Sequence, residues 1–244
     1  MHEEWLKRTE MLLGEEKLAI LKSKNVLVVG LGGVGSYAAE MIARAGVGRM
    51  TLVDGDAVNA TNINRQLVAL HSTIGKNKAR VMQERLLDIN PKLEIVVIES
   101  FIRDEFTNEV LEKGYDYVVD AIDSLSPKVF LIVQAMKMGT KIVSSLGAGG
   151  KMDPTKVQIT TMKKTYNCKF AQAVRKKLNQ LNVDTNFPVV FSPEEVDMTK
   201  IKLQENHLGQ KSMVGTMGYM PATFGMFVAS VVIRDLLGEF RIDD

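Results

Sequence analysis

The chain contains 244 residues, of which 45% are hydrophobic and 25% are charged, and its formal net charge is only +2. These values are typical of a globular protein with a buried core, and they exclude a disordered chain. Cys168 is the single cysteine, which excludes an internal disulfide and a four-cysteine zinc site and fits a reducing cytoplasm.

Residues 1–18 are charged throughout and lack the apolar core of a signal peptide. The most apolar stretch, residues 218–238, has a proline near its start and falls short of the roughly twenty apolar residues that span a bilayer. We therefore expect a buried helix there, and a cytoplasmic protein without a transmembrane span. Peripheral association with a membrane surface remains the alternative.

Amphipathic helices alternate with short apolar strands from residue 5 to residue 147. Helices are expected at residues 5–22, 34–45, 77–89, 104–113 and 127–138. Strands are expected at residues 25–29, 46–54, 93–100, 115–123 and 141–147. This alternation predicts a Rossmann-like, doubly wound α/β fold with a mainly parallel sheet and right-handed crossovers.

The pattern changes after residue 150, where we expect a strand, a basic stretch, a loop that contains proline, and the apolar C-terminal helix. We find no internal repeat and no clear interdomain linker in the sequence. A single domain of residues 1–244 is therefore the simplest organisation. It would consist of a Rossmann-like nucleotide-binding part at 1–150 and a modified C-terminal part at 151–244.

A glycine-rich turn joins the first expected strand to the helix that follows it. Gly30, Gly32 and Gly35 have the spacing of the dinucleotide fingerprint, and Gly33 adds a further glycine. Glycine lets phosphate approach the backbone, and the free N–H groups of the helix N-terminus bind it. Asp54 follows 19 residues after Gly35 at the end of the second strand, where a carboxylate can bind ribose hydroxyls. These residues predict a nucleotide site but do not distinguish NAD from ATP.

Polar residues that follow the second and fourth strands distinguish the two nucleotides. They are Asp54, Asp56, Asn62, Arg65, Gln66, Lys78 and Asp123. Ligands of this architecture bind at the carboxyl ends of the parallel strands, which is where these residues are expected. Cleavage at the α-phosphate of ATP develops charge that Arg, Lys and a metal ion stabilise, whereas a dehydrogenase needs few cations there. The residues therefore favour ATP with Mg²⁺. An NAD-dependent oxidoreductase, or a nucleotide-binding scaffold without chemistry, remains an alternative.

These motifs, Gly-x-Gly-Gly-x-Gly, Asp-x-Asp, Asn-x-x-Arg-Gln, a downstream Lys and Asp-Ala-x-Asp, lie within residues 25–124. Together they resemble the adenylating family of ThiF, MoeB and the ubiquitin-activating enzymes. The resemblance implies a ThiF-like fold and attack of a carboxylate on the α-phosphate of ATP. It assigns the nucleotide to Gly33 and Asp54, the phosphates to Asn62, Arg65 and Lys78, and Mg²⁺ to Asp123. The expected ATP-binding set is Gly30, Gly32, Gly33, Gly35, Asp54, Asp56, Asn62, Arg65, Gln66 and Lys78, with Arg65 and Asp123 as catalytic residues.

Further stretches, among them "RTEMLLGEEKL", "SLGAGGKMDPTKV" and "VIRDLLG", resemble the subgroup of tRNA threonylcarbamoyladenosine dehydratases over nearly the whole length. This resemblance implies that the carboxylate belongs to threonylcarbamoyladenosine at position 37 of tRNA. After adenylation the carbamoyl nitrogen closes a ring and expels AMP. The resemblance also implies a homodimer and a substrate-binding and dimerisation role for residues 151–244. A cysteine desulfurase or sulfur-acceptor protein is a possible further partner.

The sequence departs from this subgroup at two places and leaves a second function open. Lys169 stands where we expect proline, and the segment before Pro221 is richer in glycine and methionine than expected. The alternative is an adenylyltransferase or sulfur-carrier activator that acts on the C-terminus of a ubiquitin-fold protein. That function would require Cys168 as a nucleophile, whereas a dehydratase would use Cys168 only as a small apolar residue at a helix start.

A basic segment follows in the C-terminal part. From Pro154 to Val183 the chain has seven basic residues and no acidic one. Tyr166 lies within the segment and could stack on a displaced base. The residues expected to contact tRNA are Lys163, Lys164, Lys169, Arg175, Lys176 and Lys177. The alternative is a basic helix face that is only solvated.

Overall fold

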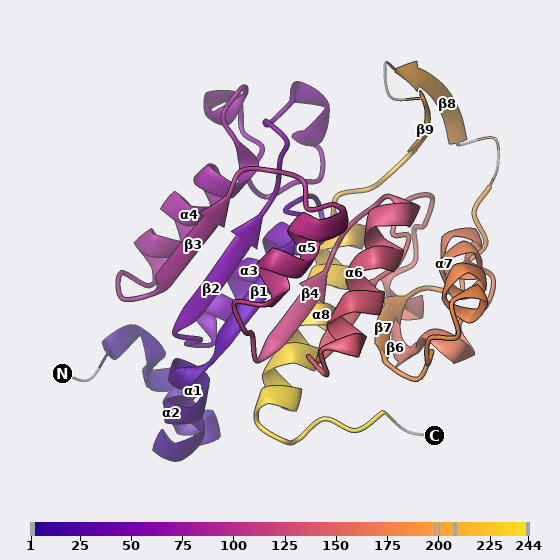
Figure 1. Ribbon diagram of the computed structural model, residues 1–244. Coiled ribbons are helices and arrows are strands. Elements are labelled where there is room, and N and C mark those ends of the chain that lie inside the picture. Colours follow the sequence, from indigo (N-terminus) through magenta and orange to yellow (C-terminus); the bar gives the residue numbers. More distant parts are fainter. Residues whose placement is uncertain (1–2, 198, 200, 207–208, 243–244) are drawn as a thin grey trace.

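A computed structural model describes residues 3–197, 199, 201–206 and 209–242, and excludes the side chains of residues 201–213. A seven-stranded sheet lies between helices on both faces (Figure 1). Its strands are β1 (Asn25–Val29), β2 (Arg49–Val53), β3 (Glu94–Ile98), β4 (Tyr117–Asp120), β5 (Ile142–Ser145), β6 (Gln158–Thr161) and β7 (Pro188–Phe191). The helices are α1 (Lys7–Leu13), α2 (Glu15–Ser23), α3 (Gly35–Arg44), α4 (Lys78–Ile89), α5 (Asp104–Leu111), α6 (Leu125–Lys137), α7 (Lys169–Gln180) and α8 (Tyr219–Leu236).

The strand order is β3-β2-β1-β4-β5-β7-β6, and every neighbouring pair is parallel except β6 with β7. The predicted doubly wound, mainly parallel sheet is therefore confirmed. The chain runs outward from β1 to β3 on one side and from β4 to β5 on the other, where β6 forms the edge of the sheet and β7 lies between β5 and β6. The switch between these directions lies between β1 and β4, where ligands bind in open α/β sheets.

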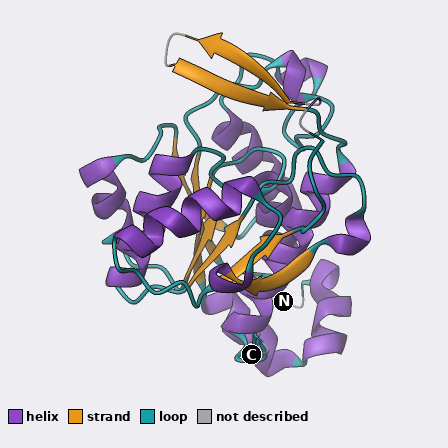
Figure 2. Cartoon of the chain, turned by 90° about the vertical axis from the view of Figure 1, so that its right-hand side faces the viewer, coloured by secondary structure: helices purple, strands orange, loops and turns teal. Residues whose placement is uncertain are grey.

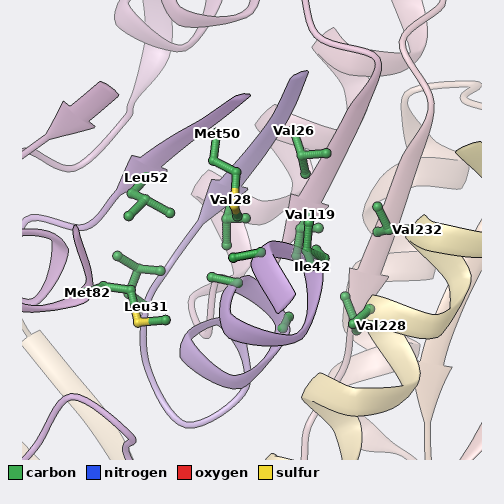
Figure 3. Close-up of a cluster of buried hydrophobic side chains, with 14 of the residues drawn as sticks. Val26, Val28, Leu31, Ile42, Met50, Leu52, Met82, Val119, Val228 and Val232 are labelled. Atoms are coloured by element: carbon green, nitrogen blue, oxygen red, sulfur yellow. The ribbon is translucent and has the colours of Figure 1, made fainter. Parts of the chain in front are cut away.

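Strand β1 shows why the sheet is covered on both faces. Val26 and Val28 pack with residues of α3, α4 and α8 in one buried cluster, part of which is drawn in Figure 3. Leu27 and Val29 point the other way and pack with residues of α5, α6 and α7. Successive side chains of a strand alternate between faces, so a continuous apolar run fills two cores.

The N-terminal helix expected at residues 5–22 is wrong as a single element. A short 3₁₀ turn, η1 (Glu4–Leu6), leads into α1, and Gly14 separates α1 from α2. The backbone of Gly14 has a φ of 83°, which glycine adopts readily and which ends an α-helix.

The C-terminal part contains more regular structure than expected. The basic stretch forms helix α7, and the stretch expected as a loop contains β7, which continues the main sheet between β5 and β6. A two-stranded hairpin, β8 (Ile201–Asn206) and β9 (Gly209–Val214), projects from the same end of the molecule as the loop after β5 (Figures 1 and 2). Its base joins that loop, because the Gly150 N–H donates to the carbonyl oxygen of Gly215.

Helix α8 is buried within the chain, as its composition predicts. Phe224, Val228 and Val232 lie in the core, and Gly225 packs so closely on α3 that a Cβ there would lie 2.5 Å from the carbonyl oxygen of Val34. One side of α8 stays accessible, because Tyr219 and Met226 are 43% and 49% exposed, so the expectation that the apolar C-terminal helix contributes to a dimer surface stays a prediction. Among the described residues, none of the helices is long and apolar enough to cross a membrane.

Candidate nucleotide and substrate site

The glycine-rich turn lies at the carboxyl end of β1, beside the turn that follows β4. Gly30 has a φ of 89°, and a Cβ there would lie 2.8 Å from the carbonyl oxygen of Ala121. A Cβ on Gly35 would lie 1.8 Å from the carbonyl oxygen of Gly30. These two glycines are needed for the backbone to close the turn. At Gly32 the nearest atom to a Cβ would be Nε2 of the Gln66 side chain at 3.8 Å, an ordinary contact distance, so the closure of the turn does not require glycine at this position.

Asp54, at the end of β2, connects the glycine-rich turn to the loop that follows. Its Oδ2 accepts a hydrogen bond from the Leu31 N–H at 2.7 Å, and its Oδ1 accepts one from the Asp56 N–H at 2.8 Å. Burial raises the pKa of Asp54, and the positive charge of Lys78 acts in the opposite direction. The carboxylate thus holds the turn in shape in addition to any contact that it makes with ribose.

Lys78 is buried at the first position of α4. Its Nζ lies 2.9 Å from Oδ2 of Asp56, whose side chain is half exposed. Asn77 caps the helix by accepting hydrogen bonds from the Ala79 and Arg80 N–H groups. The backbone of 56–58 pairs with that of 75–78, which places this ammonium at the carboxyl end of the sheet.

Arg65, Asn62 and Gln66 come from the loop around the 3₁₀ turn η2 (Ala60–Asn62). Arg65 Nη1 donates to the Thr61 carbonyl oxygen and to Asn64 Oδ1, both at 2.9 Å. Asn62 Oδ1 accepts from the Asn59 N–H at 3.1 Å, so this side chain stabilises the turn.

The same loop touches the glycine-rich turn and the start of α8. A Cβ on Gly33 would lie 3.3 Å from the carbonyl oxygen of Arg65 and 3.1 Å from Cβ of Pro221. The Gln66 side chain is buried nearby, and its Oε1 has no hydrogen-bond partner among the described residues. A buried acceptor without a partner fits a site that binds a polar ligand.

Asp123 lies just beyond β4, and sequence reasoning missed the buried cluster behind it. Lys128 Nζ donates to Asp120 Oδ2 at 2.6 Å, to Ser144 Oγ at 3.1 Å and to the Ser145 carbonyl oxygen at 2.9 Å. Burial lowers the pKa of Lys128, and the charges of Asp120 and Asp123 oppose this. The signal in the sequence was a lysine inside the apolar helix "PKVFLIV".

The residues present fit a magnesium ion that is held mainly by phosphate. Among the described residues there is no group of three His, Cys, Asp or Glu side chains that could hold a metal. Mg²⁺ is commonly bound by one or two carboxylates together with substrate phosphates and water. Asp123, exposed at the carboxyl end of β4, can supply such a carboxylate.

The basic segment begins next to this cluster and runs away from it along α7. Phe170 lies with its ring centroid 5.8 Å from Lys128 Nζ, which places the start of α7 at the carboxyl end of β4 and β5. Cys168 is buried at the N-cap of α7, while Tyr166 is 52% exposed and contacts Phe191 edge to face.

The six basic residues expected to contact tRNA are not equivalent. Lys163, Lys164, Lys169, Lys176 and Lys177 are exposed. Arg175 is half buried, and its Nη1 donates to the carbonyl oxygen of Thr165 at 2.6 Å. Arg175 therefore holds α7 against the residue that follows the preceding 3₁₀ turn, η5 (Met162–Lys164).

Comparisons with known proteins show which family the chain resembles. A model described as the ThiF family matches residues 6–243. The tRNA threonylcarbamoyladenosine dehydratase of Bacillus subtilis is 37% identical over 246 residues, which cover 96% of this chain and 95% of that protein. The Escherichia coli protein of the same name is 36% identical over 252 residues, with coverages of 95% and 92%.

Solved structures give the same result. The crystal structure of E. coli TcdA in complex with ATP matches with a TM-score of 0.87 and 34% identity, and covers 97% of this chain and 96% of that chain. By contrast, the adenylyltransferase and sulfurtransferase UBA4 of Saccharomyces cerevisiae (strain YJM789) is 30% identical over 148 residues, 61% of this chain and 33% of that protein. The family match over nearly the whole chain, with the nucleotide motifs in place, shows that the chain belongs to the ThiF family.

Proposed function

We propose that the chain is an ATP-dependent tRNA threonylcarbamoyladenosine dehydratase. The observation that carries this proposal is the similarity to dehydratases of that name over more than nine tenths of both chains. The ATP complex of the E. coli relative supports ATP as the nucleotide. Arg65, Lys78 and Asp123, which follow β2 and β4 at the carboxyl ends of the strands, support it as residues suited to stabilise phosphate charge.

In the proposed reaction, a carboxylate oxygen of the modified adenosine attacks the α-phosphate of ATP, and pyrophosphate leaves. The backbone N–H groups of the glycine-rich turn and the start of α3 bind the phosphates. Lys78, already paired with Asp56, adds a positive charge there. Arg65 stabilises the negative charge that develops at the α-phosphate, where a cation in a partly buried site has its largest effect. Asp123 would hold Mg²⁺, and the positive charge of the ion would stabilise the negative charge of the phosphates.

The second step needs no nucleophile from the protein. The carbamoyl group of the same nucleoside attacks the activated acyl carbon, the bond to AMP breaks, and a cyclic product with one water less remains. A nucleophile tethered to the acyl group has a high effective concentration, so the enzyme needs only to hold the threonylcarbamoyl group of the substrate in place for the ring to close. This leaves Cys168 without a chemical role in the proposed function, in keeping with its burial.

The modified base would approach from the β5 and α7 side, with the tRNA backbone along α7. The exposed lysines of the basic segment and the exposed ring of Tyr166 support this direction.

We further propose that the enzyme works in the cytoplasm as a homodimer. Met11 and Leu12 on α1, which are 78% and 84% exposed, are apolar side chains that a second copy could cover.

Mass analysis of tRNA nucleosides tests the function directly. The protein is incubated with ATP, Mg²⁺ and tRNA that carries threonylcarbamoyladenosine. The tRNA is then digested to nucleosides, and their masses are measured by mass spectrometry. The expected result is a product lighter by one water, with AMP and pyrophosphate formed in equal amounts. Unchanged tRNA, together with adenylation of a ubiquitin-fold protein ending in Gly-Gly, would instead support the sulfur-carrier function.

A further inference from the structure

Asp120, Lys128 and Ser144 form a closed hydrogen-bonded cluster whose three side chains are each fully buried. Lys128 Nζ and Ser144 Oγ both donate to Asp120 Oδ2, at 2.6 Å each, and Ser144 Oγ also accepts from Lys128 Nζ. With the Ser145 carbonyl oxygen, Lys128 has three acceptors, which match the three N–H groups of an ammonium. All donors of Lys128 are thus used within the protein, and none is left for a phosphate.

The second oxygen of Asp120 acts on the turn that carries Asp123. Asp120 Oδ1 accepts a hydrogen bond from the Ile122 N–H at 3.1 Å. This bond fixes the backbone one residue before Asp123, at the point where the chain leaves β4. Because Lys128 and Ser144 hold the other oxygen of the same carboxylate, the orientation of the turn depends on all three residues.

A purely stabilising role explains this cluster poorly. Moving two charged groups from water into the protein interior costs desolvation free energy, and the attraction between the charges only partly offsets this cost. A buried ion pair is therefore weak evidence that the pair stabilises the folded state. Such a pair does define geometry, because a displaced partner leaves an unsatisfied charge. The geometry defined here is that of the turn between Asp120 and Asp123.

We propose that the Asp120–Lys128–Ser144 cluster is a positioning device that holds the Asp123 carboxylate at the metal and phosphate site. The inference rests on the proposed function only in taking ATP with Mg²⁺ as the ligand. Residues that orient a metal-binding carboxylate typically change metal affinity or activity by about 10- to 100-fold when they are replaced.

The test uses the double variant Asp120→Leu/Lys128→Met. Lys128→Met alone leaves an unpaired buried carboxylate and is expected to unfold more readily, and asparagine at position 120 would keep an oxygen that accepts from the Ile122 N–H. ATP binding is measured by calorimetry with and without Mg²⁺, in the absence of tRNA. We expect a folded protein whose binding of ATP without Mg²⁺ is within about twofold of the parent. The Mg²⁺ concentration that gives half of the full binding enhancement should rise about 10-fold or more.

Lys151→Met is the matched control. Lys151 is also buried, and its Nζ donates to the carbonyl oxygens of Ser192 and Glu194, away from the Asp123 turn. This variant should keep the parental Mg²⁺ dependence. Asp123→Asn should shift the dependence in the same direction as the double variant.

Parental Mg²⁺ dependence in a folded double variant would overturn the proposal, because the cluster would then be only structural. Loss of ATP binding without Mg²⁺ would also overturn it, because the cluster would then support the whole nucleotide pocket. These outcomes are distinct from failure of the proposed function, which would appear as tRNA that stays unmodified although the parent binds Mg²⁺ and ATP.

Discussion

At the scale of single residues, the position of Arg65 decides how the site would stabilise charge. Its guanidinium is anchored through Nη1 to Thr61 and Asn64, and its backbone adjoins Gly33 of the glycine-rich turn. An anchored cation loses little conformational entropy when negative charge develops next to it. We therefore expect Arg65 to stabilise the transition state, in which that charge develops, more than the bound substrate.

Arg65→Ala is therefore expected to lower kcat by about 100-fold or more, with a much smaller change in the KM for ATP. Pyrophosphate release at saturating tRNA measures both constants. Arg80→Ala, which removes an exposed arginine paired with Glu99, serves as the control and should leave both constants near the parental values. Parental kcat in the Arg65 variant would remove this residue from the site.

Cys168 is the residue that separates the two candidate functions. It is buried at the N-cap of α7, where no side chain caps the helix. Serine is a favoured N-cap residue because its hydroxyl accepts from a free N–H of the first turn. Cys168→Ser should thus preserve the fold and most of the dehydration activity, measured as cyclised nucleoside per unit time. Complete inactivity in a folded protein would favour the sulfur-carrier function.

At the scale of elements, a charged contact joins α3 to α4. Glu40 of α3 is buried and lies 2.5 Å from Arg85 Nε on α4 and 2.8 Å from Arg44 Nε. Burial raises the pKa of Glu40, but the hydrogen bonds from the two arginines outweigh it, so the pKa lies below the ordinary value.

Because the folded pKa is depressed, the Glu40 carboxylate stabilises the fold above the unfolded pKa of about 4.3, and this contribution is lost as the pH falls through the folded value. Glu40→Gln should lower the free energy of unfolding by on the order of 2 kcal/mol at neutral pH, with the difference shrinking toward pH 3. Urea unfolding between pH 3 and pH 7 measures it. A difference that stays constant over this range would contradict the assignment, and Glu99→Gln on the exposed surface should change little.

The second prediction for an element concerns α7 and the turn before it. Ala171, Val174 and Leu178 of α7 pack into the core, so the lysines lie on the opposite, solvent-facing side. Lysines that contact phosphate release counterions on binding, and each contact adds about 0.7 to 0.9 to the slope of log affinity against log salt.

Replacing Lys163, Lys164, Lys176 and Lys177 by glutamine should weaken tRNA binding and flatten this slope, while ATP binding stays unchanged. Filter binding over a salt series gives the slope. The control replaces Lys113 and Lys137, exposed lysines at the ends of α5 and α6, and should keep the parental slope. If the fourfold variant behaves like the parent, α7 is only a solvated basic face.

At the scale of the whole molecule, the order of the strands brings three separate loops to one end of the sheet. The turns after β1, β2 and β4 meet there because β1 lies between β2 and β4. Their combined chemistry, a glycine-rich turn with two cations and a carboxylate, suits a triphosphate rather than a dinucleotide.

ATP with Mg²⁺ should therefore raise the melting temperature, and NAD should leave it unchanged. At an ATP concentration 100 times its Kd, the stabilisation is about 2.7 kcal/mol. Thermal unfolding with each nucleotide makes the comparison, and calorimetry provides the affinity. Stabilisation by NAD without any effect of ATP would contradict the assignment to an adenylating enzyme.

Local sequence patterns are enough to predict the features that depend on residues close together in the chain. The alternation of apolar strands and helices, the glycine-rich turn and the buried character of α8 all follow from short-range patterns, because side-chain periodicity and glycine content act locally. Most expected helices and strands lie within a few residues of the observed ones. The break at Gly14 and strand β7 were missed, since a single glycine and a four-residue strand give weak local signals.

Contacts between polar groups that are distant in sequence become visible only in the folded chain. Lys78 donates to Asp56, the Leu31 N–H donates to Asp54, and both Lys128 and Ser144 donate to Asp120. These partners are separated by 8 to 24 residues in the sequence. Such contacts depend on strand order and on the packing of α6 against β4 and β5, which no local pattern specifies. The tertiary structure also packs Gly225 of α8 closely against the start of α3, whereas α7 buries only one face and exposes its lysines. The motifs thus predicted residues for the site, while the arrangement of the sheet determines which of them contact one another.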